Sequence, residues 1–134
     1  MSNFTYSTHN PNYSTPDAIY KELNNKYHFN FDPCPLNPNP TINGLEMERG
    51  TSTFVNPPYT GITAWIKKAI SESEKGKLVV MLLRGDTSTK WFHELIIPNA
   101  EDIIFIKGRI RFKNNHNAPF PSIIVIFKKS LDNI

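Results

Sequence analysis

Six consecutive apolar residues, from Leu78 to Leu83, place the strongest limit on what this chain can fold into. An apolar run of that length without polar alternation is typical of a strand covered on both faces, as in the centre of a parallel sheet. The run is far shorter than the roughly 20 residues that cross a bilayer. The pattern therefore predicts an α/β protein in which helices pack on both sides of a sheet.

Helix and strand patterns alternate along the rest of the chain. Apolar side chains recur at helical spacing after Thr15-Pro16-Asp17, where a capping residue, a proline and an acid favour a helix start. The last strands follow one another closely, which predicts an antiparallel pair at the C-terminal end of a mostly parallel sheet. The expected helices are Pro16–Tyr27, Ile62 to the stop at Gly76, and a segment from the capping candidates Thr87 and Ser88 to Pro98; the expected strands are Phe29–Phe31, Thr53–Val55, Leu78–Leu83, Ile103–Ile106, Ile110–Phe112 and Ile123–Phe127.

Length and composition fit one domain with one core. The chain has 134 residues, 39% of them hydrophobic, and its first residues are polar without an apolar period. We therefore expect a flexible arm over residues 1–14 and a single domain over residues 15–134. One cysteine and four scattered histidines predict neither a disulfide nor a metal site. The lack of a membrane-spanning or targeting segment predicts a cytoplasmic protein without a membrane partner.

A mild positive charge permits a polyanionic partner. The net charge is +3, and Asp and Glu are few in the last third of the chain, where basic residues gather. A solvated basic face explains the same pattern equally well, so both interpretations stay open. The basic residues are Lys107, Arg109, Arg111, Lys113, Lys128 and Lys129.

The segment Asn56-Pro57-Pro58-Tyr59, between a predicted strand and a predicted helix, has the most distinctive chemistry. Two prolines fix the backbone and remove two N–H donors, so the loop presents carbonyl oxygens. The Asn56 carboxamide adds an acceptor, and Tyr59 adds a flat aromatic face. Such a loop suits a planar ring or amide that bears an –NH2 group, although a proline-rich turn with an aromatic plug is the structural alternative.

Further segments accompany this motif in a fixed order. They are Thr15-Pro16, Asp32-Pro33-Cys34, the helix with Trp65, the strand Val79–Leu83, Thr87–His93, Gly108-Arg109-Ile110-Arg111-Phe112 and Ala118-Pro119-Phe120-Pro121-Ser122. Together with Asn56-Pro57-Pro58-Tyr59 they resemble the phage-type DNA N6-adenine methyltransferases, from about Thr15 to Phe127. The resemblance implies a three-layer Rossmann-like methyltransferase fold, S-adenosylmethionine as the cofactor, and adenine in DNA as the methyl acceptor, in a bacterium or a phage-infected host cell.

Carried over residue by residue, the resemblance implies two ligand sites and a DNA-binding segment. The catalytic residues are Asn56, Pro57, Pro58 and Tyr59. The cofactor-binding residues are Thr15, Pro16, Asp32, Pro33 and Cys34 together with Asn56. The candidates for DNA binding are Arg109, Arg111 and Lys113. Because only Pro35 to Ser52 separates the two ligand segments, the implied fold is abbreviated.

Other functions fit the same residues. One is an inactive or cofactor-poor module that binds nucleic acid as a subunit of a larger assembly. Another is methylation of an RNA adenine or of a protein glutamine amide, and the mild basicity favours nucleic acid over a protein target. The sequence does not fix the oligomeric state. Trp65 and Trp91 are expected in the core, and His93 and His116 are expected at the surface or a helix end.

Overall fold

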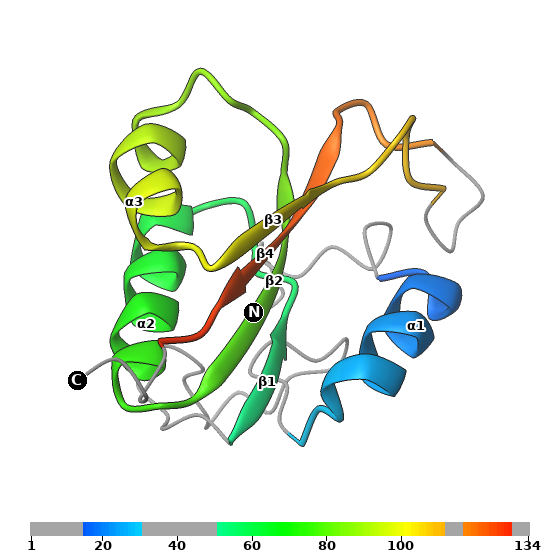
Figure 1. Ribbon diagram of the computed structural model, residues 1–134. Coiled ribbons are helices and arrows are strands. Elements are labelled where there is room, and N and C mark those ends of the chain that lie inside the picture. Colours follow the sequence, from blue (N-terminus) through cyan, green and yellow to red (C-terminus); the bar gives the residue numbers. More distant parts are fainter. Residues whose placement is uncertain (1–14, 31–50, 112–116, 130–134) are drawn as a thin grey trace.

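A four-stranded sheet lies at the centre of the described structure (Figure 1). The computed structural model describes residues 15–30, 51–111 and 117–129. None of the helices in these ranges has the length and apolar character needed to pass through a bilayer. In chain order the elements are α1 (Asp17–Tyr27), β1 (Ser52–Val55), α2 (Ile62–Glu74), β2 (Leu78–Arg84), η2 (Phe92–Ile96), α3 (Ile97–Asn99), β3 (Asp102–Phe105) and β4 (Ser122–Phe127).

The strand order is β1-β2-β4-β3. β1 pairs with β2 in parallel, and β4 lies antiparallel between β2 and β3. The predicted antiparallel pair at the C-terminal end is therefore confirmed. The strand pairing does not confirm the predicted, mostly parallel sheet, because two of the three strand pairs in the described ranges are antiparallel. β1, β2 and β3 nevertheless run in the same direction, so their carboxyl ends meet at one edge of the sheet.

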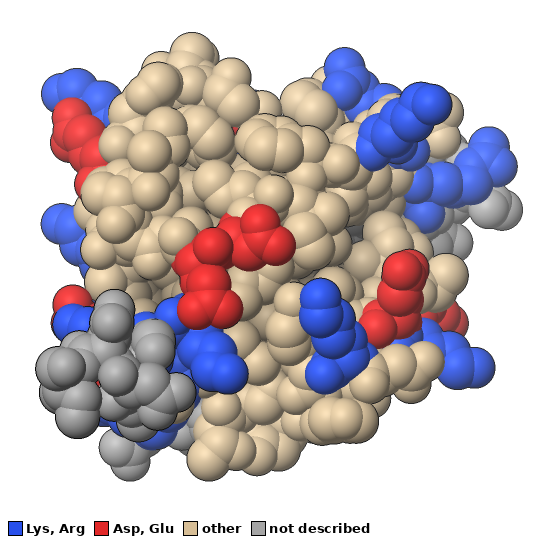
Figure 2. Space-filling model, viewed as in Figure 1, with Lys and Arg blue, Asp and Glu red and all other residues tan. Residues whose placement is uncertain are grey.

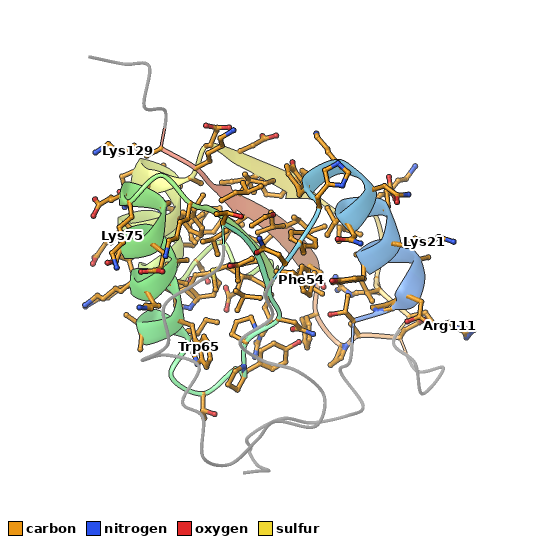
Figure 3. The ribbon with its side chains drawn as sticks, turned by 90° about the horizontal axis from the view of Figure 1, so that it is seen from below. Lys21, Phe54, Trp65, Lys75, Arg111 and Lys129 are labelled. Carbon is orange, nitrogen blue, oxygen red and sulfur yellow. The ribbon has the colours of Figure 1, made fainter. Side chains whose placement is uncertain are left out.

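Helices cover both faces of this sheet, as the apolar run predicts. On one face Val79, Met81 and Leu83 pack against α2 and η2; on the other Val80 and Leu82 pack toward α1. Alternate residues of β2 point to opposite faces of the sheet, so this one strand contributes buried side chains to both faces. Figure 3 shows Phe54 of β1 between α1 and α2, while Lys21 points outward from α1.

The start of α1 differs from the prediction. Pro16 holds the cap position in an extended conformation, without a side-chain cap bond, and the helix begins at Asp17. Thr15 was expected to cap this helix, and that prediction is wrong. Because Pro16 itself is extended and holds the cap position, Thr15 lies one residue too early to cap the helix, and its Oγ1 accepts from Asn56 Nδ2 instead.

Two short predicted strands are not formed where the structure describes them. α1 ends at Tyr27, and the next residue, His28, has a left-handed φ of 55°. The Phe29 N–H donates to Asn24 Oδ1 at 2.8 Å, and residues 29–30 join no strand. The segment at Ile110 contributes only an isolated antiparallel bridge between Arg111 and Asn117. Phe31 and Phe112 lie outside the described residues.

The helix after β2 continues past its predicted stop at Pro98. Thr89, rather than Thr87 or Ser88, supplies the cap: its Oγ1 accepts from the Phe92 N–H at 3.2 Å. The turn η2 is π-helical, with the Ile97 N–H bonded to the Phe92 carbonyl, and α3 then ends at Asn99. A proline lacks an N–H and crowds the carbonyl four residues earlier, and the wider π turn accommodates both effects.

A buried carboxylate fastens the end of α2 to the start of β2. The Glu72 side chain is 0% exposed, and Lys68, Lys75 and Lys77 approach it at 3.5, 2.8 and 3.2 Å. The Glu72 carbonyl also accepts from the Lys75 and Lys77 backbone N–H groups. The charge cluster thus fixes the turn that leads into the central strand.

Candidate active site

The loop Asn56-Pro57-Pro58-Tyr59 leaves β1 at the edge where the carboxyl ends of β1, β2 and β3 meet. Pro57 is buried and the other three residues are half-buried. The loop ends at Gly61, whose left-handed φ of 73° begins α2 and would strain any residue with a Cβ. Two prolines and this turn hold the loop in one backbone conformation.

A hydrogen bond joins two of the predicted site residues. Asn56 Nδ2 donates to Thr15 Oγ1 at 3.0 Å, across 41 positions of sequence. The bond fixes the orientation of the carboxamide, whose nitrogen faces Thr15 while its acceptor oxygen, Oδ1, points away from the Thr15 hydroxyl. Pro16 follows at the start of α1, whereas Asp32, Pro33 and Cys34 lie outside the described residues.

An aromatic pair stands beside this loop. The ring of Tyr59 meets that of Phe120 edge to face, with centroids 5.2 Å apart and planes at 88°. Phe120 precedes β4, and the Gly85 N–H donates to the Pro121 carbonyl at 2.7 Å, which ties this segment to the end of β2. The guanidinium of Arg84 lies over both rings, 5.6 Å from the Tyr59 centroid and 5.1 Å from that of Phe120.

A pocket of about 200 Å³ adjoins Tyr59 on the side of α2 and η2. Asp86 on its wall accepts bonds from the Ser88 N–H and hydroxyl, so the turn after β2 is held by side-chain contacts. The described lining residues are Tyr59, Ile62, Arg84, Asp86, Thr89 and Trp91. The pocket therefore combines two aromatic rings with a cation, a carboxylate and a hydroxyl at one sheet edge.

Sequence reasoning did not single out Arg84 or Phe120 as site residues. Phe120 lies in a segment that contributed to the family resemblance, and that was the available signal. Arg84 directly follows the apolar run of the central strand and belongs to no motif. Neither contact is visible in a local pattern, because Tyr59 and Phe120 come from loops that only the sheet brings together.

The basic segment after β3 forms an exposed corner near this edge. Lys107, Arg109 and Arg111 are exposed, and Figure 2 shows Lys and Arg gathered over the loop that follows β3. Two backbone contacts hold this segment against the residues that precede Phe120. They are the bridge between Arg111 and Asn117 and the hydrogen bond from the Ala118 N–H to the Ile110 carbonyl, at 2.8 Å. Lys113 lies outside the described residues.

The tryptophans and histidines singled out in the sequence lie in different surroundings. Trp65 is buried in the core, as expected. Trp91 is only partly buried and packs against the same core while lining the pocket. His93 is an exposed residue whose Nε2 contacts the Thr87 carbonyl at 2.7 Å. His116 is outside the described residues.

Fold and site together define a mixed α/β protein with hydrogen-bond acceptors and an aromatic pair at one edge of the sheet. The family model for DNA N-6-adenine-methyltransferase (Dam) matches residues 3–132, and the chain belongs to this family. A DNA N-6-adenine-methyltransferase of Haemophilus phage HP1 is 34% identical over 117 residues, which cover 75% of this chain and 67% of the relative. One of Escherichia phage T1 is 43% identical over 55 residues, which cover 41% of this chain and 23% of the relative. No solved structure matches the chain.

Proposed function

We propose that this chain transfers a methyl group from S-adenosylmethionine to the exocyclic N6 amine of adenine in DNA. Membership of the Dam family supports this reaction. The observation that carries it is the Asn56 carboxamide, held by Thr15 at the end of β1 and one short loop from the Tyr59 ring. We also propose that the reaction takes place in the cytoplasm of a bacterium or a phage-infected host, where such a DNA substrate is found.

The adenine amine is a poor nucleophile because its lone pair is delocalised into the ring. Asn56 Oδ1 and the Pro57 carbonyl accept hydrogen bonds from the two N–H groups of the amine and draw its nitrogen toward tetrahedral geometry, which localises the lone pair. These bonds strengthen as the amine gains positive charge, so they stabilise the transition state more than the bound substrate. Tyr59 holds the ring by stacking after the base has left the duplex.

The polar residues at the strand edge fit an amino-acid-bearing cofactor. Ligands of α/β sheets bind beyond the carboxyl ends of strands, and Thr15 and Asn56 place neutral donors and acceptors there. In our proposal Thr15, Pro16 and Asn56 hold the cofactor with Asp32, Pro33 and Cys34, and the Asp32 carboxylate accepts from its ammonium or ribose hydroxyls. When bound, S-adenosylmethionine supplies an electrophilic methyl group.

The finer fold assignment is also part of the proposal. Helices on both faces of the sheet, three strands in one direction and an antiparallel strand between the last two support an abbreviated three-layer Rossmann-like methyltransferase fold. We further propose that residues 15–134 form one domain. The exposed corner with Arg109 and Arg111, together with Lys113, is proposed to bind the DNA backbone.

Replacement of Asn56 by Ala tests the reaction. The variant loses an interaction that strengthens in the transition state, so single-turnover methylation of DNA at saturating cofactor should slow by about 10²–10³. Because Asn56 is also one of the proposed cofactor-binding residues, saturating cofactor keeps any loss of cofactor affinity out of the measured rate. A rate within twofold of the parent would contradict this mechanism.

Two further measurements separate the other functions. S-adenosylmethionine that binds only the native state must raise the melting temperature, so an unchanged melting temperature would favour an inactive module. Tritiated methyl transfer to DNA, RNA and protein, followed by identification of the methylated product, distinguishes N6-methyladenine in DNA from the same base in RNA and from methylated glutamine.

A further inference from the structure

Arg84 is a cation at the candidate active site that the proposed methyl transfer does not use. It is the last residue of β2, its side chain is exposed, and in the described part of the chain it takes part in no ion pair. Its contacts are with the rings of Tyr59 and Phe120, at 5.6 and 5.1 Å. Among the described residues this guanidinium has no carboxylate partner, and it is held beside rings suited to base stacking, so a substrate phosphate can serve as its anion.

The backbone around Arg84 is fixed more tightly than its side chain. Arg84 pairs with Ser122 in the β2–β4 ladder, and the next residue, Gly85, bonds to the Pro121 carbonyl. A Cβ at Gly85 would lie 3.3 Å from Ile123 Cγ2, so the backbone at the end of β2 packs closely against β4. The side chain can change its partner while the strand stays in place.

The two rings and a phosphate compete for the same guanidinium. A planar guanidinium stacks on aromatic faces, and a nucleobase stacks on the same kind of face. An exposed cation–π contact is weak, whereas an Arg–phosphate pair has charge-assisted, bidentate hydrogen bonds. A nucleotide that enters the site offers both a base for the rings and phosphates for the guanidinium.

We propose that Arg84 leaves Tyr59 and Phe120 when the target adenine enters, and binds a phosphodiester that flanks it. Arg84 thereby occupies the rings in the absence of DNA and positions the strand in its presence. This inference rests on the proposed function, because it takes the rings as the place where adenine stacks. It assigns the ligand of Arg84 to a backbone phosphate on either side of the flipped nucleotide.

A chemical double-mutant cycle tests the proposal. The binding of parent and Arg84→Ala protein is measured with a DNA duplex that the parent methylates. The duplex carries either natural phosphodiester linkages or neutral methylphosphonate linkages beside the target adenine. Neutralising the linkages should weaken parent binding about tenfold in 0.1 M salt, the order expected for one phosphate contact. Arg84→Ala should bind the natural duplex about tenfold more weakly and lose nothing further with the neutral linkages.

Lys26→Ala is the matched control. Lys26 is exposed and lies over the Tyr27 ring at 5.3 Å, so the substitution removes the same charge and the same type of contact. Lys26 lies in the last turn of α1, at the opposite end of that helix from Thr15. The variant should behave as the parent. Arg84→Gln, with an unchanged melting temperature, guards against a folding defect in the alanine variant.

The outcomes are distinct for the inference and for the function on which it rests. Arg84→Ala affinity within twofold of the parent, or equal sensitivity of both proteins to the neutral linkages, overturns the role of Arg84 alone. A parent chain that neither binds nor methylates any duplex overturns the proposed function and this inference together.

Discussion

The bond between Thr15 and Asn56 determines how the carboxamide is presented to a substrate. Thr15→Val keeps the shape of the side chain and removes the acceptor at 3.0 Å from Nδ2. We expect single-turnover methylation at saturating cofactor to slow about fivefold, since one net hydrogen bond contributes about 1 kcal/mol. Thr15→Ser should restore most of the rate. If Thr15 serves only the cofactor, the dissociation constant for S-adenosylmethionine will rise while the saturated rate stays unchanged, which would contradict this prediction.

Local sequence identified Asn56 and Tyr59 but not the contacts that orient them. The Thr-Pro pair indicates a helix start, yet the Thr15 hydroxyl bonds to a residue 41 positions away. Arg84 likewise meets Phe120 only because β4 lies beside β2. Residue types predict what a side chain can do, whereas its partners depend on the tertiary structure.

At the scale of elements, the predicted strands Thr53–Val55, Ile103–Ile106 and Ile123–Phe127 are confirmed to within one residue at each end, whereas those at Phe29–Phe31 and Ile110–Phe112 are not formed in the described residues. The central strand, Leu78–Arg84, and the helix Ile62–Glu74 end within two residues of their predicted ends. The alternation at Phe29–Phe31 was too short to specify a pairing partner. The π turn before Pro98 was also missed, because propensity patterns distinguish helix from strand but not one helical pitch from another.

The junction of α2 and β2 gives a stability prediction. Glu72→Gln removes the charge that Lys68, Lys75 and Lys77 share, and hydrogen bonds to charged groups contribute about 1.5–3 kcal/mol. We expect the free energy of unfolding, measured with urea, to fall by about 2 kcal/mol. Glu74→Gln makes the same charge change at an exposed position of the same helix and should stay within about 0.5 kcal/mol of the parent. Equal effects of the two substitutions would show that the cluster adds no stability.

For the whole molecule, alternating patterns predicted helices on both faces of a sheet, but not the strand order. Pairing is non-local, and nothing in the spacing of the last strands shows that β4 lies between β2 and β3. That order shapes the site. The start of an antiparallel β4 lies at the same edge as the ends of β1 and β2, which brings Phe120 to Tyr59 and the basic segment close behind it.

The basic segment should contribute to DNA affinity by binding phosphates directly. With Arg109 and Arg111 both replaced by Ala, the log–log slope of affinity against salt should fall in magnitude by about 0.9 for each phosphate that is no longer bound, so by up to about 1.8. The charge-matched control is Lys21→Ala with Lys67→Ala, two exposed positions on α1 and α2. Both double variants have the same reduction of long-range attraction at low salt, so the difference between their slopes measures direct phosphate binding. If the arginine variant keeps the slope of the control, this corner is solvated surface, and the DNA backbone must be held elsewhere.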